Sequence, residues 1–214
     1  MKGINLTSSL HTVKRTVTVA EKEGKNVRHV TLERSFKTTA DELWDAVTNP
    51  KRLVHYLGSV SGQLALGGRF QIESNAEGTV TKCIQPQTFA TTWEFAGGVS
   101  WIEVQITAEG EVEATLRLTH ICPVDNHWQK FGPGAGGVGW DLVLLGLEAH
   151  LSDPSFTSQA GEALLATEEG KAFMIGSSED WGQAAIAAGE EPGQAEVAAK
   201  RTTAFYTGGE MPED

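Results

Sequence analysis

GPGAGGVGWDLVLLGLEAHL, residues Gly132–Leu151, is the stretch that decides the fold of this 214-residue chain. Its glycine-rich lead-in ends near Gly137, and the apolar run that follows predicts a long helix. At about 100° per residue, Asp141 and Glu148 fall on one narrow polar stripe, and apolar residues and glycines occupy the rest of the circumference. Because only this narrow stripe of the helix is polar, other parts of the chain must cover the helix on most of its sides. Its line of glycines admits either close backbone packing or a small molecule.

Composition and charge exclude several classes of protein. The net charge is -11, and the residues after Leu151 carry -9 of it, because 12 acidic side chains there face 3 basic ones. Nucleic acids and anionic membranes are therefore poor partners. The N-terminal MKGINLTSSLHTVKR has no apolar core of signal-peptide length, which predicts a cytoplasmic protein. Cys83 and Cys122 lack metal-ligand spacing, and we expect no metal and no other cofactor.

Upstream of the long helix, the sequence predicts an antiparallel sheet interrupted by two short helices. Valine-rich runs at 11–20 and 27–36, joined by a polar turn, predict a hairpin. The stretches 38–47 and 51–57 predict helices separated by the Asn49-Pro50 break. Six short runs with regular turn signals then predict a meander, and they span 60–64, 68–74, 78–85, 89–95, 100–108 and 112–121. Residues 1–10 are expected to be frayed.

Alternation along the strands assigns their side chains to two faces. The face expected to be concave and to meet the long helix carries Phe70, Ile72, Val80, Ile84, Phe89, Thr91, Trp93, Phe95, Ile102, Val104, Ile106, Leu116, Leu118 and His120. Alternation leaves the faces of Lys82 and Arg117 ambiguous, and the stem of Lys82 is expected to be buried while its ammonium reaches solvent. Trp101 then lies on the outer face, where an exposed indole needs a cover.

After Ser152 the pattern becomes helical and rich in alanine. Helices are predicted at 160–166, 168–175, 179–188 and about 193–206, with a break at Gly176-Ser177-Ser178. We therefore expect a first domain over 1–152 and an acidic helical extension over 153–214. The extension is predicted to cover the outer sheet face near Trp101, or to make a dimer contact, through Trp181 and Phe205.

Several segments together resemble a known family. They are ERSFKTTADELWDAVTNPKRLVHYLG at 33–58, LGGRF at 66–70, TTWEF at 91–95, LRLTH at 116–120 and the long helix itself. Over residues 27–151 the chain resembles the SRPBCC superfamily (START and Bet v 1-like), in the subgroup similar to the C-terminal domain of the activator of Hsp90 ATPase. It departs from the pattern at Tyr56-Leu57, where many members have an aromatic pair. The extension, with WGQAAIAAG and KRTTAFYTGG, is similar to one found in some actinobacterial members.

The resemblance implies an α+β helix-grip fold, in which an antiparallel sheet of about seven strands curves around the long C-terminal helix. It also implies a cavity between the sheet and the long helix, where superfamily members bind lipids, hormones, polyketides or other hydrophobic molecules. We expect non-catalytic binding of a small hydrophobic or aromatic molecule, and the residues expected to contact it are Tyr56, Phe70, Trp93, Val104, Leu118, His120, Trp140, Val143, Leu144 and Leu147. An enzyme of the polyketide cyclase or aromatase kind and a chaperone-binding domain are the alternatives. A homodimer is also compatible with the sequence.

His120 is the polar residue that stands out among the inward-facing side chains. It could orient or protonate a ligand, or it could be a core histidine satisfied by a neighbouring backbone group, and the second situation is the more common. Neither cysteine has a His–acid partner nearby in the sequence, so a cysteine nucleophile is not predicted. Gly132–Gly137 lacks the ending of a phosphate-binding loop, so its glycines are expected to let the chain turn before the helix.

Overall fold

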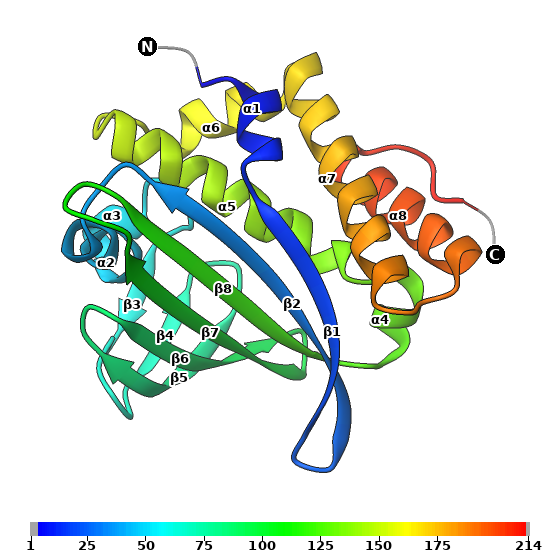
Figure 1. Cartoon of the computed structure of the whole chain (residues 1–214), viewed down its shortest axis with the longest axis horizontal. Coiled ribbons are helices and arrows are strands. Elements are labelled where there is room, and N and C mark those ends of the chain that lie inside the picture. The colour runs from blue at the N-terminus through cyan, green and yellow to red at the C-terminus, as the bar shows by residue number, and fades with distance from the viewer. Residues whose placement is uncertain (1–3, 213–214) are drawn as a thin grey trace.

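The computed structural model describes residues 4–212, which form one curved antiparallel sheet clasping a long helix (Figure 1). The strands are β1 Lys14–Lys22, β2 Lys25–Phe36, β3 Val60–Gly62, β4 Arg69–Ile72, β5 Glu77–Ile84, β6 Thr88–Phe95, β7 Gly98–Ala108 and β8 Ala114–Pro123. The helices are α1 Leu6–His11, α2 Ala40–Thr48, α3 Pro50–Leu53, α4 Asn126–Phe131, α5 Gly134–Ser152, α6 Ser158–Leu165, α7 Glu168–Ala187 and α8 Pro192–Thr207. None of the helices in residues 4–212 is long and apolar enough to cross a membrane.

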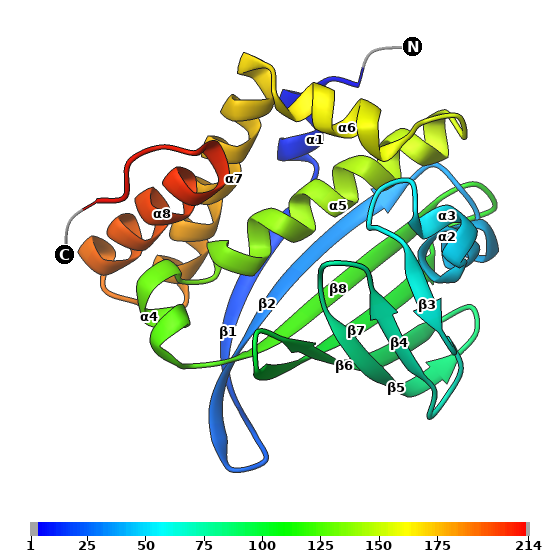
Figure 2. The same cartoon turned by 180° about the vertical axis from the view of Figure 1, so that it is seen from behind.

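The sheet runs in the order β1-β2-β8-β7-β6-β5-β4-β3, and every neighbouring pair is antiparallel. This confirms the α+β helix-grip architecture. The sheet has eight strands rather than about seven, because the N-terminal hairpin joins it through the pairing of β2 with β8. Helix α5 lies along the concave face, and the short helices α2 and α3 stand at one end of it (Figure 2).

The two short helices form where local capping favours them. Thr39 accepts a hydrogen bond from the backbone N–H of Glu42 at 3.2 Å and so caps α2. Asn49 ends α2 and caps α3, whose first residue is Pro50, a position where the missing N–H of proline costs nothing. The predicted break at Asn49-Pro50 is therefore present as two caps back to back.

Helix α5 begins at Gly134, so among the glycines predicted to turn the chain only Gly132 does so, with φ 59°, and Gly134, Gly136 and Gly137 belong to the helix instead. A Cβ atom at Gly137 would lie 2.4 Å from the Trp181 ring, and one at Gly134 would lie 3.0 Å from Thr202. Glycine is a poor helix former, at about 1 kcal/mol per residue. In α5 this cost is outweighed by packing, because the missing side chains of Gly134 and Gly137 let α8 and α7 approach the helix closely.

The extension packs against α5 and β1, and the prediction that it covers the outer face near Trp101 is wrong (Figure 1). Trp181 is fully buried in the same core as Val138 and Trp140, whereas Phe205 is 63% exposed. Trp101 is covered instead by Lys22 of β1, whose ammonium lies 4.9 Å from the indole centroid. The segments 1–152 and 153–214 therefore share one core.

Helix α7 is continuous through Gly176-Ser177-Ser178, where the sequence predicted a break. Serine favours helix ends because its hydroxyl competes for backbone groups. Within α7, the Ser178 hydroxyl donates to the carbonyl of Met174 at 2.8 Å, and the Ser177 hydroxyl donates to the Asp141 carboxylate at 2.6 Å. Both hydroxyls are satisfied inside the fold, so the helix continues.

The N-terminal segment and the polar stripe of α5 also differ from expectation. Leu6 and Leu10 of α1 are buried beside Leu145 and Phe173, so fraying is wrong for this helix, while residues 1–3 lie outside the described part. Asp141 and Glu148 do not form a wet edge, because each is paired with an arginine from the sheet. Asp141 bonds Arg15 at 3.0 Å, and Glu148 bonds Arg34 at 2.6 Å.

Candidate ligand cavity

A cavity of about 330 Å³ lies between the concave sheet face, α5 and the α2–α3 pair. This volume is at the lower end of the range typical of small-molecule sites. Its lining residues are Trp44, Val47, Thr48, Leu53, Tyr56, Leu57, Val60, Leu64, Phe70, Ile72, Val80, Cys83, Gln85, Phe89, Thr91, Trp93, Ile102, Val104, Leu116, Leu118, Trp140, Val143, Leu144 and Leu147. Among the residues that the structure describes, the lining contains no Asp, Glu, Lys, Arg or His.

The structure brings nine of the ten sequence-predicted site residues to this cavity, and they are Tyr56, Phe70, Trp93, Val104, Leu118, Trp140, Val143, Leu144 and Leu147. His120 is the exception, since it lies behind the cavity wall. Sequence reasoning missed the contribution of α2, namely Trp44, Val47 and Thr48. The spacing of Trp44 and Val47 on one face of a predicted helix was the signal available for it.

Aromatic rings form two walls of the cavity. Trp93 of β6 and Trp140 of α5 have ring centroids 5.2 Å apart, with an interplanar angle of 60°. Trp44 meets the edge of Phe89 at 5.9 Å and 83°. Such tilted and edge-on contacts are the favoured arrangements of aromatic pairs. The walls therefore hold flat apolar surfaces in fixed positions around the empty space.

Tyr56 closes the cavity near α3 without offering it a polar group. Its hydroxyl donates to the carbonyl of Ala46 at 2.7 Å, and burial raises the pKa of this phenol well above its usual range. Its Cβ rests against Gly146 of α5, where an added Cβ would lie only 2.7 Å away. Gly146 therefore provides the space that Tyr56 occupies between α3 and α5.

His120 supports the wall from behind. Its Nδ1 accepts a hydrogen bond from the Trp140 indole N–H at 3.1 Å, and its Nε2 bonds the Ser100 hydroxyl at 2.8 Å. Because Nδ1 accepts, the proton resides on Nε2 and the ring is neutral. Burial lowers the pKa of His120 to about 4, which agrees with this assignment. His120 is a satisfied core histidine, but its partners are side chains rather than the expected backbone group.

A β-bulge in β5 changes which of its side chains face the cavity. Val80 pairs with Thr91, but the next pair is Lys82 with Ala90, so the register shifts by one residue between them. A one-residue shift turns every later side chain to the opposite face. Cys83 and Gln85 therefore line the cavity, whereas Lys82 and Ile84 are exposed, and the inward placement predicted for Ile84 is wrong.

Polar contacts outside the cavity lining connect the short helices α2 and α3 to the end of α5. Arg52 Nε donates to His150 Nε2 at 3.1 Å, and Arg52 also pairs with Glu42 at 2.7 Å and Asp45 at 3.1 Å. His55 stacks on His150 with centroids 4.9 Å apart. Burial, together with the charges of Arg52 and His55, lowers the pKa of His150. Within residues 4–212, no group of three His, Cys, Asp or Glu side chains is placed to hold a metal ion.

An antiparallel sheet gripping a helix around an apolar cavity defines the class of the protein, a helix-grip fold of the SRPBCC type. The family model described as activator of Hsp90 ATPase homolog 1-like protein, AHSA1, matches residues 37–152, more than half of the chain. The chain belongs to this family. A search among curated proteins found no match.

Solved structures share the fold at low sequence identity. CalU16 from Micromonospora echinospora has a TM-score of 0.67 at 21% identity, over 80% of this chain and 97% of its own. An HSP90 activator from Plasmodium falciparum, PFC0360w, has a TM-score of 0.52 at 22% identity, over 58% and 96%. DynU16, described as a putative protein in the dynemicin biosynthetic locus, has a TM-score of 0.52 at 21% identity, over 60% and 48%. These likenesses show the fold alone.

Proposed function

We propose that this protein binds a small, largely apolar molecule in the cavity between the sheet and α5, without catalysing a reaction. The observation that carries the proposal is the cavity of about 330 Å³, whose walls are built from aromatic and aliphatic side chains. Burial of apolar ligand surface there would provide the driving force, at about 25 cal/mol per Å². The fixed aromatic rings favour ligands with flat faces.

The chemistry of the lining supports binding over catalysis. A polyketide cyclase or aromatase needs a general acid or base within reach of the substrate. The lining has no carboxylate, imidazole, amine or guanidinium, and the hydroxyl of Tyr56 is engaged with a backbone carbonyl. His120 is separated from the cavity by Trp140, which it holds in place. The chaperone-binding alternative rests on fold likeness to the Plasmodium activator, and fold likeness alone does not carry a function.

A cavity-filling variant tests the proposal with neutral 1-naphthol as the probe. Val143 lines the cavity from α5, and Val143→Phe places a ring in the ligand's space. Isothermal titration should show binding to the wild-type chain and at least tenfold weaker binding to Val143→Phe. The matched control is Val112→Phe, because Val112 is 74% exposed and is not one of the lining residues. Unfolding temperatures establish that both variants are folded, and equal binding by all three chains would contradict the proposal.

A further inference from the structure

We infer that the cavity selects a neutral ligand carrying a hydrogen-bonding oxygen, such as a phenol, ketone or quinone, and that the Thr91 hydroxyl is the group that recognises this oxygen. The inference rests on the proposed function and names the chemical class of the ligand. It combines two observations, the missing charge in the lining and a buried lining threonine whose hydroxyl makes no hydrogen bond within residues 4–212.

Thr91 lies on β6 in the apolar floor of the cavity. It pairs with Val80 on one side and Ile102 on the other, and the residue is 7% exposed. Its hydroxyl makes no hydrogen bond to any other group in residues 4–212, so it can donate to or accept from a ligand in the cavity. Thr48, which also lines the cavity, differs because its hydroxyl donates to the carbonyl of Trp44 at 2.7 Å.

The absence of charge in the lining limits what can enter. A carboxylate or phosphate moved into this space would leave water and meet no cation, which costs far more than apolar contacts can offset. The bulge in β5 contributes directly, because without its register shift the ammonium of Lys82 would face the cavity in place of Cys83. A fatty acid or a phosphorylated molecule can therefore bind only with its charged group left in water at the entrance, whereas a neutral molecule with an oxygen near Thr91 can be enclosed and gains one hydrogen bond.

The entrance lies where Cys83 and Gln85 line the cavity, since both residues are also exposed to solvent. Cys83 gives a direct readout of occupancy at this entrance. The other cysteine, Cys122, is half-buried, and burial raises the pKa of its thiol to about 12, so it reacts more slowly with thiol reagents than Cys83. A ligand in the cavity should slow the alkylation of Cys83 by iodoacetamide.

Three probes that share a naphthalene ring test the inference. The affinities of 1-naphthol, 1-methylnaphthalene and 1-naphthoate are measured from protection of Cys83 and from isothermal titration at pH 7. Wild-type protein should prefer the naphthol over the methyl compound by roughly two- to tenfold, the worth of one hydrogen bond. It should bind the anionic naphthoate more than tenfold more weakly than the naphthol.

Thr91→Val keeps the shape of the side chain and removes the hydroxyl, so it should abolish the preference for naphthol while the methyl compound still binds. Thr91→Ser should keep the preference. Thr48→Val, in which the lost hydroxyl was already bonded, should keep the ratio of the two affinities. A preference unchanged in Thr91→Val, or naphthoate bound as tightly as naphthol, overturns this inference and leaves the proposed function standing. Failure of all probes to bind the wild-type chain overturns both.

Discussion

Asp141 is the residue that joins the sheet, the long helix and the extension. Its two carboxylate oxygens accept hydrogen bonds from Arg15 at 3.0 Å, and one also accepts from Ser177 at 2.6 Å and from the Trp181 indole at 2.9 Å. Burial raises the pKa of Asp141, while the charge of Arg15 and these hydrogen bonds oppose that shift. Removing one partner of a buried pair generally costs about 3–5 kcal/mol. We therefore regard Asp141 as a structural residue.

His120 gives a prediction for the pH dependence of stability. Its pKa is about 4 in the folded chain and about 6.5 in a model peptide, so the unfolded chain binds a proton between these values that the folded chain does not. Stability from this residue is present above pH 6.5 and is lost as the pH falls towards 4. Between these limits, the free energy of unfolding of the wild-type chain should fall more steeply than that of His120→Asn, by up to about 1.4 kcal/mol per pH unit.

Urea unfolding curves of the two chains across pH 4–7 measure this difference. Buried or paired carboxylates titrate in both chains, so only the difference between the slopes reports on His120. Parallel slopes would mean that the imidazole takes up its proton over the same pH range in the folded and unfolded chains, which contradicts its role as the acceptor for the Trp140 indole.

At the scale of elements, the line of glycines in α5 determines how the helices pack. Gly137 and Gly139 lie two residues apart, and they differ in what a side chain would meet. A Cβ at Gly137 would clash with rigid ring atoms of Trp181 at 2.4–2.7 Å, whereas a Cβ at Gly139 would meet only the Tyr206 hydroxyl at 3.0 Å. The first contact joins α5 to the buried face of α7, and the second joins it to the tip of a side chain on α8.

Gly137→Ala should therefore destabilise the protein by about 1–3 kcal/mol, the usual cost of overpacking, even though alanine favours helix. Gly139→Ala is the matched control, and its effect should stay within about 1 kcal/mol, because the gain in helix propensity offsets a small shift of the tyrosine. Thermal unfolding of the two variants beside the wild type measures both changes. Equal losses of stability in the two variants would show that the contact between Gly137 and the Trp181 ring is not tight in solution.

Most elements of the fold could be predicted from the sequence, because hydrophobic period and turn residues act locally. The strands and the helix before Asn49-Pro50 lie close to their predicted places, whereas the helix after it ends at Leu53 rather than at residue 57. The start of α5 at Gly134 and the continuity of α7 could not be predicted, since both depend on contacts between segments far apart in the chain. Local propensity indicated the opposite in each case.

In the candidate site, too, features set by the local sequence pattern could be predicted, and features set by distant contacts could not. Alternation placed Thr91 and Trp93 on the inner face, and family resemblance placed the cavity between sheet and helix. The bulge after Val80 has no clear signature in the sequence. Because of this bulge, Cys83 rather than Lys82 lines the cavity. His120 was correctly placed inward, but only the coordinates show that Trp140 and Ser100 occupy both of its ring nitrogens.

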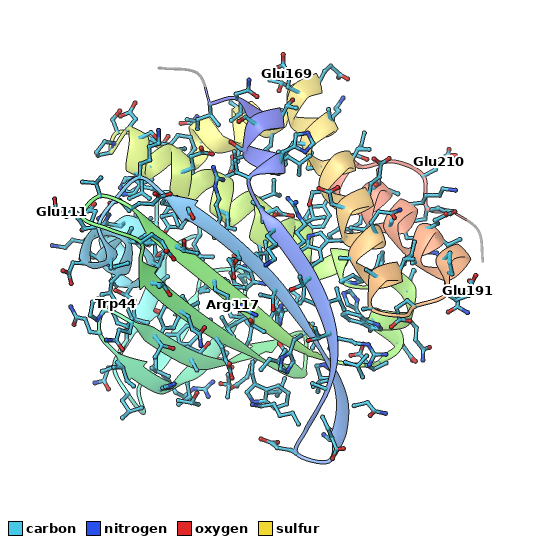
Figure 3. The ribbon with its side chains drawn as sticks, in the orientation of Figure 1. Trp44, Glu111, Arg117, Glu169, Glu191 and Glu210 are labelled. Carbon is cyan, nitrogen blue, oxygen red and sulfur yellow. The ribbon has the colours of Figure 1, made fainter. Side chains whose placement is uncertain are left out.

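For the whole molecule, the extension has an inner and an outer face with different roles. The inner face completes the core through Trp181, Phe173 and Met174, so the predicted division after Ser152 separates parts that are packed together. The outer face carries acidic side chains, and Figure 3 shows Glu169, Glu191 and Glu210 around the edge of the C-terminal helices. A like-charged surface of this kind favours solubility and disfavours binding to polyanions.

A crystal structure of the protein grown with saturating 1-naphthol tests the central claim most directly. We expect the ring to lie between the sheet and α5, against Trp93 and Trp140, with its oxygen within hydrogen-bonding distance of the Thr91 hydroxyl. An empty cavity, or the probe bound only on the outside of the molecule, would contradict it.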